Sequence, residues 1–122
     1  MTIPILRLSK GRVIFTSSGA ARHSYVGWGA YSASKSALKS LSDTLAIEEP
    51  DIITMSVEPG TVDTDMQRDI REKHISAMDE KEHQRFISLH EDGKLASPEG
   101  PGHLMANLVL NAPKELNGQT FR

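Results

Sequence analysis

The sequence contains no cysteine among its 122 residues. That absence excludes a disulfide framework and a thiolate metal site, and it agrees with a reducing compartment, so we expect a cytoplasmic protein. Long apolar runs are missing too. The stretch from Met1 to Lys10 lacks the sustained apolar region of a signal peptide, and the apolar runs elsewhere are only a few residues long. The sequence therefore predicts neither secretion nor a membrane partner.

An excess of charge of one sign is also lacking. The net charge is −2, and the Lys and Arg residues are interspersed with acids. Such a chain offers no basic field to nucleic acid, so no nucleic-acid partner is predicted. Hydrophobic residues make up 38% and charged residues 25%, which is typical of a soluble protein with a packed core. We expect a single domain over residues 1–122.

The first half of the chain has the pattern of a strand, a helix and a second strand. Val13–Phe15 is a short apolar run closed by small polar residues, which predicts a parallel strand buried on both faces. Apolar residues then recur at helical spacing from Ala30 to Ile47, and Glu49-Pro50 stops that helix. The β-branched run Ile52–Val57 predicts the second strand, parallel to the first. Together they make one βαβ unit.

The second half predicts further helices and one more strand. Residues 65–92 mix charges with apolar residues, which indicates one or two amphipathic helices interrupted near residues 76–79 and stopped by Gly93. Ser97 resembles an N-cap before a helix that begins at Pro98 and runs to residue 111. A turn then leads into a short strand at residues 119–121. The fold class is therefore α/β.

One spacing in the βαβ unit suggests chemistry. Tyr31 and Lys35 are four residues apart on the predicted helix, so they share a face. A nearby ammonium favours the phenolate form of a tyrosine, which makes Tyr31 a candidate proton donor to a carbonyl. Ser18 lies thirteen residues before Tyr31, at the carboxyl end of the first strand, where open α/β sheets bind their ligands. Its hydroxyl would polarise and position the same carbonyl.

A tyrosine and a lysine at this spacing are weak evidence alone, because the pair arises by chance in roughly one such chain in ten. The alternative interpretation is that Tyr31 and Lys35 belong to an ordinary helix surface. The specific signal is the conjunction with Ser18 and with Pro59-Gly60-Thr61-Val62-Asp63-Thr64, which follows the second strand.

With these motifs the chain, from about Lys10 to Phe121, resembles the second half of the short-chain dehydrogenase/reductase family. The resemblance implies that Ser18 holds the substrate carbonyl, that Tyr31 donates the proton while a nicotinamide delivers hydride, and that Lys35 assists the tyrosine and binds the nicotinamide ribose. It also implies NADP, or NAD, as cofactor. The cofactor-binding residues that it implies are Tyr31, Lys35, Pro59, Gly60, Val62 and Thr64.

The segment Gly27-Trp28-Gly29-Ala30-Tyr31 most resembles the fungal branch of the family that is related to benzil and sepiapterin reductases. That likeness implies reduction of a small ketone or diketone. Tyr25 and Trp28 precede the catalytic helix in a polar, glycine-rich loop. They either line the substrate pocket or pack against the neighbouring helix.

The first half of the family pattern has no counterpart in this sequence. No glycine-rich phosphate loop follows a strand, so cofactor binding by this chain alone is in question. We expect a truncated Rossmann-like domain: the second half of a doubly wound parallel sheet, with about three strands and their crossover helices. The residue that would distinguish NAD from NADP lies in the missing half.

A half-sheet would leave the strand at Val13–Phe15 with one unpaired edge and would leave apolar helix surface exposed. We therefore expect homo-oligomers, which the family resemblance places on the helix Ala30–Ile47. The alternative function is an inactive fragment that acts at most as a dimerisation or binding module through this helix.

Two other site types receive little support. No pair of histidines has the spacing of a metal site, so no metal is predicted and the histidines are expected on the surface or in loops. Ser18 with His23 lacks both a Gly-x-Ser-x-Gly turn and an acid to orient the histidine, which argues against a hydrolase. The histidines are His23, His74, His83, His90 and His103.

Overall fold

A computed structural model describes residues 2–122 of the chain. Strand β1 (Arg12–Thr16) pairs in parallel with strand β2 (Ile53–Val57), and helix α2 (Gly29–Glu48) is the crossover between them. Strand β3 (Thr120–Phe121) pairs in parallel with the other edge of β2. The strand order is therefore β1-β2-β3, and the predicted α/β fold with about three parallel strands is confirmed.

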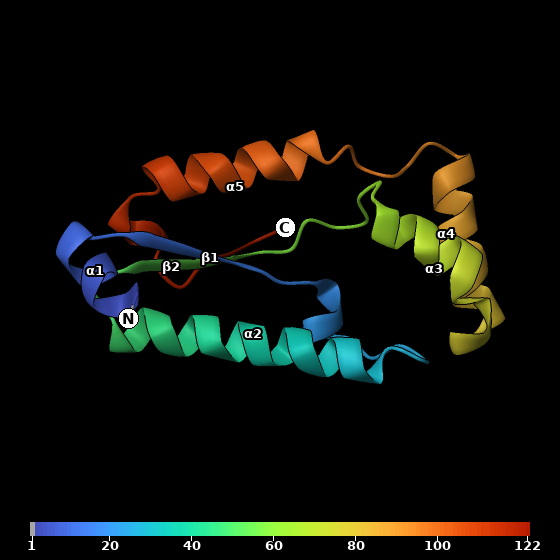
Figure 1. Ribbon diagram of the computed structural model, residues 1–122, viewed down its shortest axis with the longest axis horizontal. Coiled ribbons are helices and arrows are strands. Elements are labelled where there is room, and N and C mark those ends of the chain that lie inside the picture. Colours follow the sequence, from blue (N-terminus) through green and yellow to red (C-terminus); the bar gives the residue numbers. More distant parts are fainter. Residues whose placement is uncertain (1) are drawn as a thin grey trace.

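The sheet lies between two helical layers (Figure 1). Helix α2 runs along one side of it, and helix α5 (Glu99–Asn111) runs along the other. Helix α1 (Thr2–Ser9) precedes β1 and was not anticipated from the sequence. Within residues 2–122, no helix has the length and apolar character that crossing a bilayer requires.

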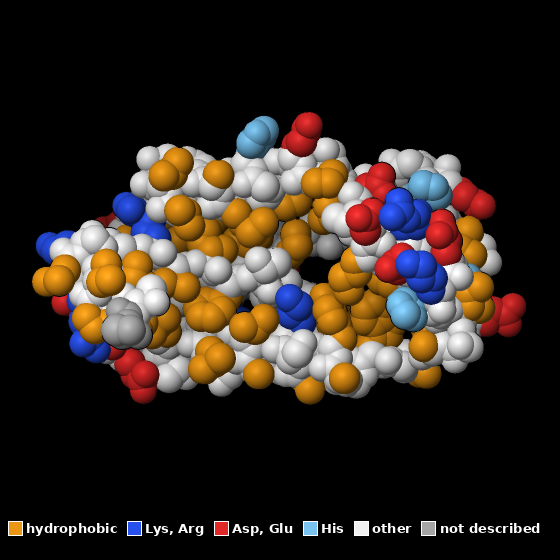
Figure 2. All heavy atoms as spheres, in the orientation of Figure 1, with side chains coloured by type: hydrophobic (Ala, Val, Ile, Leu, Met, Phe, Trp, Pro, Cys, Tyr) orange, Lys and Arg blue, Asp and Glu red, His pale blue; other side chains and the backbone are white. Residues whose placement is uncertain are grey.

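Strand β2 carries the buried core. Met55 and Val57 are almost fully buried and cluster with Leu108 and Ala112 at the carboxyl-terminal end of α5. Strand β1 was expected to be equally buried, but that prediction is wrong because its residues are half-buried or exposed. The reason is its position: among residues 2–122, β1 pairs with β2 alone and is an edge strand. Figure 2 shows hydrophobic side chains gathered between the two helical layers on the face that is drawn.

A pair of helices lies at one end of the molecule (Figure 1). Helix α3 (Asp65–Lys73) begins at Thr64, whose hydroxyl accepts a hydrogen bond from the Gln67 N–H. Helix α4 (Glu80–Glu91) begins in the same way at Asp79. The short 3₁₀ helix η2 (Ile75–Ala77) separates them and begins one residue before the predicted interruption.

The start of α5 differs slightly from expectation. Pro98, predicted as the first helical residue, occupies the N-cap position. Ser97 still performs a capping role, because its Oγ accepts a hydrogen bond from the Glu99 N–H at 3.3 Å. Serine and proline therefore mark the start of the helix as expected, but the helix begins one residue later than predicted.

We predict that Met55→Ala lowers the free energy of unfolding by about 2–5 kcal/mol, because it leaves a cavity in the fully buried centre of β2. Urea unfolding followed by circular dichroism measures the change. Ile47→Ala is the control, since Ile47 is 82% exposed and its loss should change stability by less than about 0.5 kcal/mol. Equal effects of the two substitutions would contradict this placement of the core.

Candidate active site

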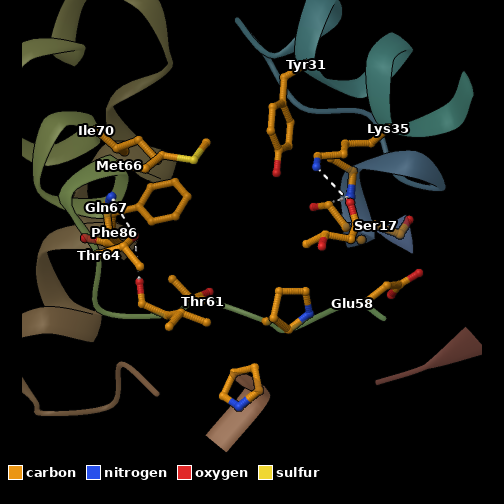
Figure 3. A pocket seen from close by; sticks show the side chains of 18 of the residues that line it. Ser17, Tyr31, Lys35, Glu58, Thr61, Thr64, Met66, Gln67, Ile70 and Phe86 are labelled. Carbon is orange, nitrogen blue, oxygen red and sulfur yellow. Dashed lines mark hydrogen bonds between the residues drawn. The ribbon is translucent and has the colours of Figure 1, made fainter. Parts of the chain in front are cut away.

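A cavity of about 730 Å³ lies at the carboxyl ends of β1 and β2 (Figure 3). Parallel strands direct the loops that follow them to the same edge of the sheet, so the loop after β1 meets the loop after β2 there. The cavity is lined by every site residue proposed from the sequence: Ser18, Tyr25, Trp28, Tyr31, Lys35, Pro59, Gly60, Val62 and Thr64.

Ser18 is held in place by the turn that it begins. Its Oγ accepts a hydrogen bond from the Ala20 N–H at 3.2 Å and so caps the 3₁₀ helix η1 (Gly19–Ala21). The Ser36 hydroxyl of α2 donates to the Ala21 carbonyl at 3.0 Å and ties the same turn to α2. A serine hydroxyl that accepts one bond still has its own hydrogen to donate. Ser18 can therefore donate to an oxygen in the cavity.

Tyr31 and Lys35 come from the first two turns of α2. The Lys35 Nζ donates to the Thr16 carbonyl at 2.9 Å and lies 5.7 Å from the centre of the Tyr31 ring. Figure 3 shows the tyrosine hydroxyl directed into the cavity and the lysine ammonium beside the end of β1. An ammonium has three hydrogens, so one bond to Thr16 leaves two for a ligand.

Aromatic rings form one wall of the cavity. Trp28 stacks on Phe86 of α4, with ring centres 5.8 Å apart, and meets Tyr31 edge to face at 5.3 Å. Met66 and Ile70 of α3 lie on the same side of the cavity as Phe86, with Tyr31 across from them (Figure 3). From the sequence, the segment from Met66 to His90 is expected to be either a lid over the substrate or a solvated helical hairpin with Met78 and Phe86 packed inward. Met66, Ile70 and Phe86 all line the cavity. This wall suits an apolar ligand.

The loop after β2 forms the floor. Gly60 has a φ of +76°, a conformation that favours glycine, and turns the chain directly after Pro59. Val62 then forms a parallel bridge with Ala96, which ties this loop to the segment before α5. Thr64 ends the loop as the N-cap of α3.

Two lining residues carry buried polar atoms without a partner among the described residues. Ser17 is 2% exposed and Gln67 is 3% exposed, and neither the Ser17 Oγ nor the Gln67 Nε2 makes a hydrogen bond there. Buried polar atoms are normally paired, so these two atoms are exceptions to that rule. The two ammonium hydrogens that Lys35 does not use toward Thr16 remain available to hydroxyl groups of a ligand.

An ion pair at the cavity was missed from the sequence. Arg22 donates two hydrogen bonds to Glu58, at 3.2 and 2.7 Å, although 36 residues separate them. The guanidinium of Arg22 lowers the pKa of Glu58 below its ordinary value, against the opposing effect of burial. A signal was available in the position of Glu58, which is an acid at the end of a buried strand directly before Pro59.

The expectation that the histidines lie at the surface is wrong for His83. This residue is 9% exposed, and its Nε2 lies 2.8 Å from the Arg71 carbonyl, which joins α4 to α3. The side chain packs inward because it lies one turn before buried Phe86 on the inner face of α4. Within residues 2–122, no group of three His, Asp or Glu residues could hold a metal ion.

Known proteins of one family resemble this chain in sequence. The short chain dehydrogenase family profile matches residues 1–75. The benzil reductase ((S)-benzoin forming) IRC24 of Saccharomyces cerevisiae is 40% identical over an alignment that covers 100% of this chain and 49% of that protein. The sepiapterin reductase of Rattus norvegicus is 39% identical over 68% of this chain and 30% of its own length.

Solved structures show the same likeness. The crystal structure of the KRED1-Pglu enzyme superposes with a TM-score of 0.93 at 47% identity, over 98% of this chain and 50% of that one. The chain therefore spans about half the length of the yeast protein and of the crystallised enzyme.

We predict that Gly27→Ala separates η2 from the loop before α2. Gly27 has a φ of +81°, and a Cβ there would lie 1.7 Å from the Ala77 carbonyl oxygen. Overlap and backbone strain together should cost about 1–3 kcal/mol of stability. Trp28 is the single tryptophan, so its fluorescence reports its separation from Phe86 directly.

Gly29→Ala is the matched control for this substitution. No atom lies within 4 Å of the Cβ that it would add, and it stands at the start of α2. Its fluorescence and stability should match those of the unmodified chain. If Gly27→Ala behaved in the same way, the close contact between the loop and η2 would be refuted.

Proposed function

The chain belongs to the short chain dehydrogenase family, and we propose that it is the catalytic half of a nicotinamide-dependent carbonyl reductase. The observation that carries this proposal is the convergence of Ser18, Tyr31 and Lys35 on one cavity. At one carbonyl, a phenol can act as the proton donor, while a hydroxyl donates a hydrogen bond to the carbonyl oxygen and an ammonium supplies positive charge beside the phenol.

The proposed reaction uses each group at a stated atom. The Ser18 hydroxyl donates a hydrogen bond to the substrate carbonyl oxygen and keeps its own proton, and this bond strengthens as negative charge develops on that oxygen. The bound cofactor supplies hydride to the carbonyl carbon. Tyr31 gives its phenolic proton to the oxygen, so the carbonyl becomes an alcohol and the phenolate regains a proton from solvent. Lys35, held near the Tyr31 ring through Thr16, stabilises that phenolate electrostatically.

We propose NADP, or NAD, as the cofactor. Tyr31 and Lys35 would bind the nicotinamide ribose, since the ammonium retains hydrogens for its hydroxyl groups. The loop after β2 would hold the rest of that end of the nucleotide, in keeping with its place along the cavity floor. The residues assigned there are Pro59, Gly60, Val62 and Thr64.

The proposed substrate is a small apolar ketone or diketone. Tyr25 and Trp28 line the cavity beside Tyr31, and Met66, Ile70 and Phe86 complete an apolar wall. Such a wall excludes water and favours substrates with hydrophobic groups next to the carbonyl. The names of the yeast and rat relatives, a benzil reductase and a sepiapterin reductase, support reduction of a carbonyl.

A second candidate is a noncatalytic dimerisation module. Among the described residues β1 pairs on one edge alone, and Leu41 and Ile47 of α2 are 58% and 82% exposed. An open strand edge and exposed large apolar side chains both favour association. This candidate does not need the cavity to bind a nucleotide.

We predict saturable binding of NADPH to the 122-residue chain, followed by nucleotide fluorescence. Lys35→Ala should weaken NADPH binding at least about tenfold, because it removes a charged hydrogen-bond donor. Tyr31→Phe should bind NADPH but reduce ketones about 10²–10⁴ times more slowly, the usual contribution of a positioned acid.

Lys39→Ala is the matched control for Lys35→Ala. Lys39 lies one turn further along α2, where its Nζ contacts Asp43, and it does not line the cavity. Its NADPH affinity should be unchanged. A folded chain that binds no NADPH would contradict the catalytic proposal and favour the dimerisation module.

We predict that the chain associates through α2. Light scattering should report a mass above 13.4 kDa, the mass of one chain. The double substitution Leu41→Glu and Ile47→Glu should shift the measured mass toward that value, because charges at exposed apolar positions oppose association. A cooperatively folded chain that is monomeric before any substitution would exclude this interface.

A further inference from the structure

The ion pair between Arg22 and Glu58 joins the two loops that carry the cavity residues. Arg22 directly follows η1, the turn that begins at Ser18, and its N–H donates to the Gly19 carbonyl at 3.0 Å. Glu58 directly follows β2 and precedes Pro59. The two side chains meet through a pair of hydrogen bonds at 3.2 and 2.7 Å. A planar guanidinium that binds both carboxylate oxygens fixes orientation as well as distance.

The pair lies just beyond the end of the sheet. The last ladder bond between the two strands runs from the Ser17 N–H to the Val57 carbonyl, at 2.8 Å. Beyond that bond, the next hydrogen bonds between the two loops within residues 2–122 are those of the Arg22–Glu58 pair. Without it, η1 keeps the Ser36 contact to α2 but loses its tie to the loop after β2.

The glutamate side of this ion pair is buried. The Glu58 side chain is 7% exposed, whereas that of Arg22 is 36% exposed. The other charged or titratable groups that act on the carboxylate are Arg122, whose Nε lies 3.5 Å away, and His23. The Glu58 backbone N–H is also fixed, because it donates to the Phe121 carbonyl at 2.8 Å. Figure 3 shows the carboxylate directed away from the α3 side of the cavity.

We propose that Arg22 and Glu58 are positioning residues of the reductase site, which hold the Ser18 turn at a fixed place relative to the Pro59-Gly60 loop. They act through Ser18, and Arg22 does not line the cavity. The inference rests on the proposed function only for the role of Ser18, since the link between the loops stands on its own geometry. The expected consequence is an ordered Ser18 hydroxyl before any ligand binds.

A second ion pair of the same kind supplies the control. Arg7 of α1 also donates two hydrogen bonds to a glutamate, Glu49, at 2.5 Å each. That pair joins α1 to the end of α2, and neither residue lines the cavity. Glu49→Gln therefore measures the effect of losing an ion pair away from the cavity. Glu58→Gln measures the effect of losing the ion pair that joins the two cavity loops.

The test measures backbone order parameters by NMR in the full 122-residue chain. Glu58→Gln should lower the order parameters of residues 19–22 from about 0.85 toward 0.6, while Glu49→Gln leaves them unchanged. Arg22→Lys keeps the positive charge, so residues 19–22 should lose less order in this variant than in Glu58→Gln. The inference is overturned if Glu58→Gln leaves these residues rigid, or if both glutamine variants loosen them equally.

The pH dependence separates positioning from mere packing. The folded pKa of Glu58 is lowered by Arg22, so the link is present above the ordinary carboxyl range of about 4.3 and is lost as pH falls through the folded pKa. Order at residues 19–22 should fall with that titration in the unmodified chain and in Glu49→Gln. It should show no such titration in Glu58→Gln, and a titration that persists there would overturn the inference.

A kinetic arm keeps the two proposals distinguishable. Where the chain reduces a ketone, Glu58→Gln should lower kcat about tenfold with little change in the KM for NADPH, because Ser18 acts on the carbonyl. An unchanged kcat would contradict a positioning role. If the unmodified chain has no reductase activity, the proposed function fails, while the order parameters still decide whether the ion pair fixes the Ser18 turn.

Discussion

The parallel pairing of β1 with β2 is the interaction on which the site depends. Its register sets Thr16 opposite Val57, so the chain leaves both strands at the same level. Ser18 follows one strand by two residues, and Pro59 follows the other by two. A slip of one residue would turn the side chains of one strand to the opposite face of the sheet and would offset the two loops from each other. The buried Met55 and Val57 resist such a slip, because it would expose them.

Helix α2 converts this register into a chemical arrangement. It begins beside the cavity with Tyr31 in its first turn, and the Lys35 ammonium reaches back to the last carbonyl of β1 at Thr16. The lysine is therefore fixed by the sheet as well as by its own helix. The tryptophan before the helix links the same tyrosine to α4, so the apolar wall and the proton donor belong to one packed group. Aromatic contacts of this kind restrict the orientation of the rings.

The sequence predicted the elements that depend on local patterns and missed the contacts that depend on distant ones. The helix expected at Ala30–Ile47 extends one residue further at each end, because periodicity determines a long amphipathic helix well. All nine proposed site residues line one cavity, although their roles stay predictions. Arg22 and Glu58 lie far apart in the chain, and no local pattern pairs them. The close approach of Gly27 to Ala77 likewise depends on how η2 packs.

We propose that one cavity at the ends of β1 and β2 receives a nicotinamide nucleotide beside a carbonyl. The most direct test is an NMR titration of the isotopically labelled chain with NADPH, in which every backbone amide is observed. We expect shifts concentrated at residues 16–18, 31–35 and 60–64, with the outer face of α5 unaffected. Shifts confined to other surfaces, or no shifts in a folded chain, would contradict it.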